Sequence, residues 1–205
     1  MEQPTLQVGG NRLFPIFIKL ETLDVLLVGG GNVGLEKLSA ILVNSPATRV
    51  TVVADRFLPE VRALAAAHAE VTLIEREFDF DDLAEKDLII LATDNKALHE
   101  RIKRVTRERR ILTNVADTPD LCDFYLGSIV QKGDLKIAIS TNGKSPTVAK
   151  RLREFLTDVI PDNIQDILDN LTVIRERIKG DFGEKVRRLN ELTAALSSKD
   201  DQPHG

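Results

Sequence analysis

A short run of glycines constrains the fold of this 205-residue chain more than any other feature. Gly29, Gly31 and Gly34 are spaced as G-x-G-x-x-G, between the apolar run 25–28 and an amphipathic stretch, 33–44. Strand, tight turn and helix in this order are typical of a dinucleotide-binding fingerprint. The first glycine makes the turn, the second lets the backbone approach a pyrophosphate, and the third lets the helix pack on the strand. The N-terminus of the helix offers N–H groups to the phosphates.

An acidic residue follows at a suitable spacing. Asp55 comes directly after the next apolar run and lies 21 residues beyond Gly34 (55 − 34). At about this distance a carboxylate accepts hydrogen bonds from the ribose hydroxyls of NAD, whereas it repels the extra phosphate of NADP. Arg56 could instead accommodate that phosphate, and Asp55 could merely cap a helix that starts near Pro59. The order of strand, glycines and acid favours NAD as the cofactor.

Apolar runs and helical periodicity alternate through the first half of the chain. This alternation predicts an α/β fold with a Rossmann-like parallel sheet, covered by helices on both faces. A further apolar segment, 13–20, is expected to join the sheet or its edge. The expected strands are 25–28, 50–53, 71–74, 88–91 and 111–113, and the expected helices are 33–44, 59–69 and 95–109, the last with Leu98, Ile102 and Val105 on its apolar face.

The pattern changes after about residue 114. Residues 123–130 and 135–140 predict two strands of a hairpin-like unit. Ser145 as N-cap and Pro146 at the first helical position then predict the start of a helix. Apolar residues continue at helical spacing to Leu196, with breaks at Pro161 and Gly180.

These changes suggest four parts. They are an NAD-binding Rossmann domain (1–117), a small α+β segment for dimerisation and substrate binding (118–150), a helical domain (151–197) and a disordered tail (198–205). The long apolar stripe of the helices favours self-association, and the alternative is that they fold back on their own sheet.

Composition excludes several classes of function. The net charge of −4 argues against a dedicated nucleic-acid partner, and no apolar run approaches the length of a membrane span. Cys122 is the sole cysteine, so no internal disulfide forms. Because the first residues also show no basic-then-apolar leader, we expect a cytoplasmic location.

Elimination leaves few catalytic candidates. The sole tyrosine, Tyr125, lacks the lysine four residues later that short-chain dehydrogenases use. One cysteine and three histidines are a poor set for a zinc site, and we predict no bound metal. His68 and His99 are expected on helices, in solvated or packing roles. A carboxylate remains as the reacting group.

Asp117 is the carboxylate that we select. It follows the fifth expected strand, at the carboxyl end of the sheet, where open α/β sheets bind ligands. The glycine turn and Asp55 belong to the same edge. Asp-Thr-Pro is also ordinary turn chemistry, so Asp117 could serve only the turn.

A second candidate for anion binding is the loop that runs from Ser140 to Pro146. It joins a strand to a helix N-terminus and combines glycine, small polar residues and a lysine, which can hold carboxylates or phosphates. Lys150, Arg151 and Arg153 follow. A plain capped loop with a solvated basic face explains the same residues equally well.

Four motifs occur in order: Gly29-Gly30-Gly31-Asn32-Val33, Leu91-Ala92-Thr93-Asp94, Asn114-Val115-Ala116-Asp117 and Ser140-Thr141-Asn142-Gly143-Lys144-Ser145-Pro146. Together they resemble the siroheme-synthase family of precorrin-2 dehydrogenases, many of which are also sirohydrochlorin ferrochelatases. The resemblance covers about residues 13–156. One departure is Gly34, where the family more often has alanine.

The resemblance implies a function. Precorrin-2 would lose a hydride to NAD⁺ and a proton to a base or water, and ferrous iron, as a substrate, would then enter sirohydrochlorin. The partners implied are an anionic tetrapyrrole and a second copy of the chain. The implied roles are catalysis by Asp117, cofactor binding by Gly29, Gly31, Asn32, Val33, Gly34, Asp55, Arg56 and Thr93, and substrate binding by Asn114, Ser140, Thr141, Gly143, Lys144 and Ser145.

Three alternatives stay open. The chain could be an NAD-sensing regulatory module without catalysis, which would need no acid at Asp117. It could oxidise another small metabolite. It could also catalyse the dehydrogenation alone, without inserting iron.

Overall fold

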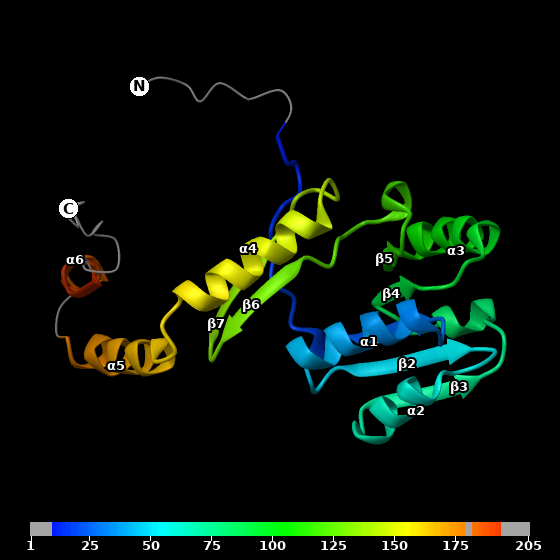
Figure 1. Cartoon of the computed structure of the whole chain (residues 1–205), viewed down its shortest axis with the longest axis horizontal. Coiled ribbons are helices and arrows are strands. Elements are labelled where there is room, and N and C mark those ends of the chain that lie inside the picture. The colour runs from blue at the N-terminus through cyan, green and yellow to red at the C-terminus, as the bar shows by residue number, and fades with distance from the viewer. Residues whose placement is uncertain (1–9, 179–181, 194–205) are drawn as a thin grey trace. The chain divides into compact units, whose positions relative to one another are not determined.

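The structure is a computed structural model that describes residues 10–178 and 182–193. The described residues form two compact units, which divide between Leu126 and Gly127, and each is described by itself (Figure 1). The boundary at 126 lies beyond position 117, where we expected the Rossmann domain to end. The four-part division stays a prediction, and its tail, 198–205, lies outside the described residues.

Unit 1 contains a five-stranded parallel sheet in the order β3-β2-β1-β4-β5. The chain runs from β1 outward to β3 and then returns to place β4 on the other side of β1. Open α/β sheets bind ligands outside the carboxyl ends of the strands at such a switch point. The strands are β1 Asp24–Val28, β2 Arg49–Ala54, β3 Val71–Glu75, β4 Leu88–Leu91 and β5 Leu112–Val115, and the helices are α1 Asn32–Asn44, α2 Pro59–Ala66 and α3 Lys96–Arg109.

Both faces of this sheet are buried, because successive side chains of a strand point to opposite faces. Val25 and Leu27 of β1 pack in one core cluster with Leu38 of α1. Leu26 and Val28 pack in a second cluster with Ile102 of α3. The predicted α/β fold with a Rossmann-like sheet is confirmed, with α1 and α2 on one face and α3 on the other.

The expectation that residues 13–20 join the sheet or its edge is wrong. Residues 11–19 have no regular secondary structure, and a short 3₁₀ helix, η1, covers Leu20–Thr22. Phe14 and Phe17 are 85% and 70% exposed. Pro15 has no N–H to donate to a strand ladder, so apolar composition alone misleads here.

Unit 2 begins with an antiparallel hairpin, β6 Ser128–Lys132 and β7 Leu135–Ile139. The expected first strand started too early, at residue 123, because residues 122–127, which follow the short 3₁₀ helix η3, Pro119–Leu121, form no strand. Helix α4, Pro146–Val159, packs on the hairpin. Helices α5, Ile164–Arg177, and α6, Phe182–Thr193, follow, and the predicted break at Gly180 lies outside the described residues.

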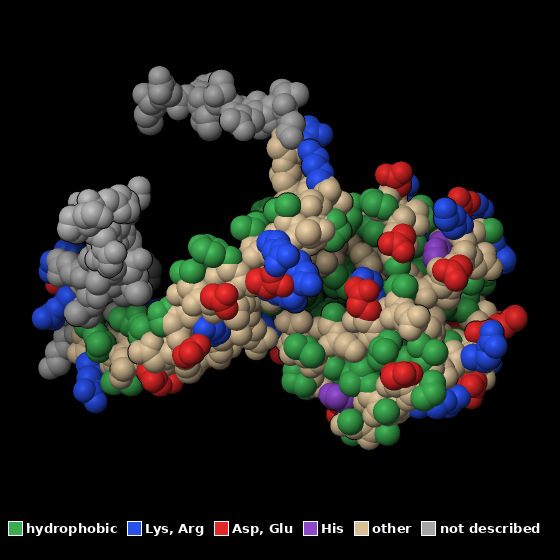
Figure 2. Space-filling view, in the orientation of Figure 1, with side chains coloured by type: hydrophobic (Ala, Val, Ile, Leu, Met, Phe, Trp, Pro, Cys, Tyr) green, Lys and Arg blue, Asp and Glu red, His purple; other side chains and the backbone are tan. Residues whose placement is uncertain are grey.

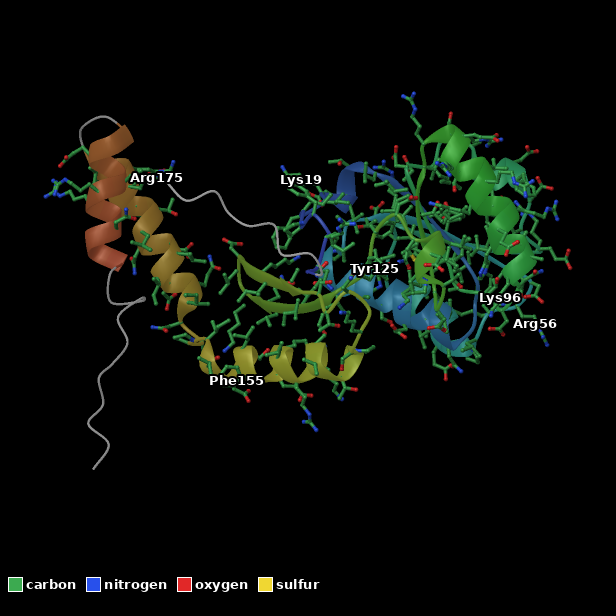
Figure 3. The ribbon with its side chains drawn as sticks, turned by 90° about the horizontal axis from the view of Figure 1, so that it is seen from above. Lys19, Arg56, Lys96, Tyr125, Phe155 and Arg175 are labelled. Carbon is green, nitrogen blue, oxygen red and sulfur yellow. The ribbon has the colours of Figure 1, made fainter. Side chains whose placement is uncertain are left out.

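An apolar stripe on α4 stays exposed within the chain. Val148, Leu152, Phe155 and Val159 recur at helical spacing and are between 43% and 60% exposed. Hydrophobic side chains are visible along this helix in Figure 2, and Figure 3 shows Phe155 on the side of α4 turned away from the hairpin. Separately, none of the helices in the described ranges is both long and apolar enough to cross a membrane.

Candidate functional site

The register of the sheet brings four predicted site residues to one edge. Val28 pairs with Leu91 on one side and with Val53 on the other, and Leu91 pairs with Val115. The loops that follow this row contain Gly29 after β1, Asp55 after β2, Thr93 after β4 and Asp117 after β5. Because neighbouring strands are about 4.8 Å apart, the β1 and β5 loops begin roughly 10 Å apart, which is within the length of a dinucleotide.

Each glycine of the fingerprint has a separate physical reason. Gly29 adopts φ +126°, and a Cβ there would lie 2.3 Å from the carbonyl oxygen of Ala92. A Cβ on Gly34 would lie 2.2 Å from the carbonyl oxygen of Gly29, so α1 packs tightly on the turn. A Cβ on Gly31 would meet nothing within 4 Å. The first and third glycines therefore serve the fold, whereas Gly31 faces open space.

The N-terminus of α1 is left without a side-chain cap. Gly31 is the N-cap and accepts only from the backbone N–H of Leu35. Within the described residues, the N–H groups of Asn32, Val33 and Gly34 have no hydrogen-bond acceptor. Three N–H donors at the positive end of a helix fit a pyrophosphate. The predicted phosphate site therefore has the chemistry that a dinucleotide needs.

Asp55 and Arg56 are both exposed at the end of β2. Asp55 does not cap α2, because the N-cap of that helix is Leu58 and no side chain caps it. The carboxylate of Asp55 makes no hydrogen bond or ion pair within the described residues, so it remains available to a ligand. Figure 3 shows Arg56 and Lys96 at the same end of unit 1.

Gly30, which was missing from the predicted site, connects the glycine turn to the loop that follows β2. The backbone N–H of Leu58 donates to the carbonyl of Gly30 at 3.0 Å. A Cβ on Gly30 would lie 2.3 Å from the carbonyl oxygen of Arg56. Gly30 thus holds the β2 loop, and Asp55 with it, against the glycine turn. The signal in the sequence was a fourth glycine, at a position where the fingerprint accepts any residue.

Thr93 follows β4 and borders the glycine turn. A Cβ built on Gly29 would lie 3.3 Å from Cγ2 of Thr93. The hydroxyl oxygen of Thr93 lies 2.8 Å from Nε2 of His99, which is 2% exposed. Burial lowers the pKa of His99, and Asp94 opposes this shift. Of the two roles expected for His99, packing is the one that its burial supports.

Asp117 is exposed in the loop between β5 and η3 and adopts φ +57°. Asp tolerates this left-handed conformation better than most residues. The base of the loop is closed by two hydrogen bonds: the N–H of Thr113 donates to Oδ2 of Asp123, and the N–H of Asp123 donates to the carbonyl of Thr113. Lys103 of α3 pairs with Asp123 at 2.5 Å. No sequence pattern predicted this closure.

Asn114 and Cys122 tie the same loop to β5. Asn114 is 6% exposed, and its side-chain amide donates to the carbonyl of Phe124 at 2.8 Å. The thiol of Cys122 donates to the carbonyl of Val115 and accepts from the N–H of Val115. Burial raises the pKa of this thiol. The amide of Asn114 is engaged inside unit 1, and its substrate-binding role stays a prediction.

The predicted anion loop of unit 2 uses its polar side chains internally. Oγ1 of Thr141 donates to the carbonyl of Ser145 and accepts from its N–H. Ser145 caps α4 as predicted, because its Oγ accepts from the N–H of Val148 at 3.2 Å. Ser140 accepts from the N–H of Asn142. These side chains shape the loop, and their contact with a substrate stays a prediction.

Positive charge remains beside this loop. Lys144 is exposed, and a Cβ on Gly143 would meet nothing within 4 Å. Lys150 and Arg151 lie near Glu154, at 3.9 Å and 3.1 Å. Such exposed ion pairs are weak, so both cations can still attract an anion. In the described parts of the chain, no three His, Cys, Asp or Glu side chains form a group that could hold a metal ion.

Comparison with known families agrees with this geometry. Residues 16–128 match the family described as "Putative NAD(P)-binding", which spans unit 1 and its glycine turn. The chain belongs to this NAD(P)-binding family. Residues 132–158 match a second family, described as the sirohaem biosynthesis protein central region.

Related proteins extend the comparison. The chain is 38% identical over 181 residues to siroheme synthases from Escherichia coli O1:K1 and Escherichia fergusonii. This alignment covers 87% of the chain but 39% of each relative, so the chain spans about two fifths of their length. The structure of SirC, a precorrin-2 dehydrogenase, matches with a TM-score of 0.72 and 24% identity over 93% of this chain and 91% of that one. The predicted resemblance to the siroheme-synthase family is confirmed.

Proposed function

We propose that this chain is an NAD-dependent dehydrogenase that oxidises precorrin-2 to sirohydrochlorin. The single observation that carries the proposal is the shared edge of the sheet, where an uncapped helix N-terminus and the exposed Asp117 follow strands of one register row. Homology to siroheme synthases supports the choice of substrate, because it extends from unit 1 into unit 2.

The residues of unit 1 fit the cofactor. The N–H groups of Asn32, Val33 and Gly34 bind its pyrophosphate, and Asp55 accepts hydrogen bonds from the adenosine ribose. Arg56 is exposed beside Asp55, so selection of NAD over NADP depends on the Asp55 carboxylate repelling an extra phosphate. When bound, NAD⁺ accepts the hydride from the tetrapyrrole.

Asp117 then receives the proton that leaves with each hydride, so that the products are sirohydrochlorin, NADH and one proton. A fixed base is more effective than a mobile one, because it is already oriented towards the reacting atom. The closure by Thr113, Asp123 and Lys103 provides this fixation.

Ferrous iron insertion into sirohydrochlorin is the second step of the proposal. Iron is a substrate here, and the four ring nitrogens of the tetrapyrrole are its ligands. Two pyrrole N–H protons leave as the metal enters: the carboxylate of Asp117 is proposed to accept one, and water accepts the other. This step needs no metal-binding cluster of the protein.

Unit 2 is proposed to bind the carboxylates of the substrate through its exposed cations, Lys144 above all. We also infer that a second copy of the chain covers the exposed stripe of α4, and that the protein acts in the cytoplasm. Exposed apolar side chains at helical spacing support such an interface, because isolated monomers seldom expose a continuous stripe.

An anaerobic optical assay with precorrin-2 and NAD⁺ tests the proposal. Asp117→Asn keeps a residue that tolerates the left-handed conformation, and it should lower NADH production by roughly a hundredfold or more while NAD binding is unchanged. Asp120→Asn, in the same loop, is the matched control and should retain full activity. Normal turnover by Asp117→Asn would remove the proposed base.

Iron is added in a second stage of the same assay. Preformed sirohydrochlorin and ferrous iron, without NAD⁺, should give siroheme faster with the protein than without it. An unchanged rate would limit the protein to dehydrogenation. NAD binding without any oxidation of precorrin-2 would favour the regulatory alternative.

A further inference from the structure

His99 is the buried titratable group that the proposed reaction leaves unused. Its ring is 2% exposed on α3, and Nε2 lies 2.8 Å from Oγ1 of Thr93. Its other ring nitrogen, Nδ1, is buried and has no hydrogen-bond partner within the described residues. One nitrogen therefore has a defined partner and the other has none.

This asymmetry selects a tautomer. A neutral imidazole has one N–H donor and one acceptor nitrogen. If Nδ1 carried the proton, a buried N–H would be orphaned, which native structures tolerate less well than an unpaired acceptor. If Nε2 carries it, the N–H donates to Oγ1 of Thr93. The second arrangement leaves only a lone pair of Nδ1 without a partner.

The tautomer in turn sets the role of the Thr93 hydroxyl. A hydroxyl has one proton to donate and two lone pairs that accept. When Nε2–H of His99 occupies a lone pair, the hydroxyl proton of Thr93 remains for another acceptor. Thr93 is half-buried beside Gly29, at the carboxyl end of β4. The acceptor of its hydroxyl proton is therefore expected at this edge of the sheet, where the dinucleotide is proposed to bind.

We propose that His99 is a positioning residue: it donates from Nε2 to Thr93 and thereby presents the Thr93 hydroxyl as a donor to an oxygen atom of the bound dinucleotide. This inference rests on the proposed NAD site and adds a residue to it. His99 itself does not touch the cofactor.

Burial also keeps the ring in the form that this role needs. Desolvation lowers the pKa of His99 against the opposing charge of Asp94, so the neutral ring persists at neutral pH. A neutral ring has a single N–H, and the choice between the two nitrogens is then a choice between two directions of the Thr93 hydrogen bond.

Solution NMR of the ¹⁵N-labelled chain without ligand measures the tautomer directly. The His99 ring signals are identified by their loss in His99→Gln. A protonated Nε2 and an unprotonated Nδ1 are expected at pH 7.5. A protonated Nδ1 would overturn the proposal, because Thr93 would then be donating to the ring.

The contact with the cofactor is tested by NAD affinity, measured by calorimetry. Thr93→Val should weaken NAD binding about fivefold, the effect of one hydrogen bond, and His99→Leu should weaken it by a similar or smaller factor. Because both changes remove the same contact, the double variant should bind as weakly as Thr93→Val alone. Thr72→Val, on the exposed side of β3, is the control and should bind normally.

The outcomes separate this inference from the proposed function. Unchanged NAD affinity in Thr93→Val, or losses that multiply in the double variant, would overturn the positioning role while NAD binding itself stands. A wild-type chain that binds no NAD would overturn the cofactor contact together with the proposed function. The tautomer measurement still decides the hydrogen bond in that case.

Discussion

Two loops of this protein join a strand to the start of a helix, and they treat the helix N-terminus in opposite ways. Before α1, Gly31 provides no side-chain cap, so the N–H groups of Asn32, Val33 and Gly34 stay without acceptors. Before α4, Ser145 caps the N–H of Val148 and Pro146 has no N–H. The backbone N–H of Ala149 bonds to Ser145.

The difference separates a helix start whose N–H groups are open to a ligand from one that a side chain of its own loop caps. Both sequences combine glycine with small polar residues, and both were predicted to hold anions. The first intrahelical bond is the same in both helices, from Ala149 to Ser145 and from Leu35 to Gly31, so the α4 start leaves one N–H, that of Thr147, where α1 leaves three. More unsatisfied donors give an anion more stabilisation. In the second loop, exposed cations such as Lys144 are therefore the main groups that remain for a substrate.

Gly29→Ala should have the largest effect on stability. The new Cβ would lie 2.3 Å from a backbone oxygen, and φ of +126° disfavours any side chain. We expect a loss of about 3 kcal/mol or more in the free energy of unfolding of unit 1, measured by urea denaturation. Gly31→Ala is the control, because its Cβ meets nothing, and a loss of similar size there would contradict the separation of roles.

Gly31→Asp should abolish NAD binding without unfolding unit 1. The carboxylate enters the space beside the free N–H groups, where it blocks and repels the pyrophosphate. We expect at least a hundredfold weaker binding by calorimetry, about 2.7 kcal/mol. Gly143→Asp makes the same change in the other loop and should leave NAD affinity unchanged; equal losses would erase the contrast between the loops.

Ser145→Ala should cost the α4 start about 1 kcal/mol, the usual effect of removing an N-cap. Hydrogen exchange of α4 amides is the measurement, since it reports local opening. NAD affinity should not change, because Ser145 belongs to unit 2. Unaltered exchange in α4 would mean that the cap is dispensable there.

The smallest expected effect is a pH dependence from His99. Its pKa is lowered in the folded state from the usual 6.5 by burial, so the unfolded chain binds a proton first as the pH falls. The stabilising contribution is present above pH 6.5 and is lost as the pH falls towards the lowered value. His99→Gln should lose less stability than the wild type between pH 7.5 and 5.5 in urea denaturation. Parallel losses would contradict the lowered pKa.

Local patterns predicted much of the fold. Strand β4 has the bounds that its apolar run predicted, and the cap of α4 was predicted from Ser145 and the proline that follows it. The prediction for residues 13–20 was wrong, because apolar side chains alone do not pair a segment with a neighbouring strand. The contact of His99 with Thr93 was not predicted, because Leu98 and Ile102 already accounted for the apolar face of α3.

In the candidate site, too, local features were predicted from the sequence and contacts between distant residues were not. The spacing of Gly29, Gly31 and Gly34 predicted the turn, since Gly29 and Gly34 leave no room for a Cβ and Gly31 leaves open space beside the helix start. The closure of the Asp117 loop did not show in the sequence, because Thr113 and Asp123 are ten residues apart and no periodicity connects them. Gly30 was hidden for a similar reason, since its neighbour, Arg56, belongs to the next strand loop.

By itself, the sequence determined the parallel sheet, the dinucleotide turn and the acids that follow β2 and β5, because these features depend on residue type and short spacing. Tertiary structure decided which polar groups remain unsatisfied. The N–H groups that follow Gly31 have no acceptor, whereas the hydroxyl of Ser145 accepts from its own helix and Nε2 of His99 is hydrogen-bonded to Thr93. The physical reason is that a hydrogen-bonding group is available to a ligand only when the folded chain offers it no partner, and those partners come from segments that sequence patterns do not connect.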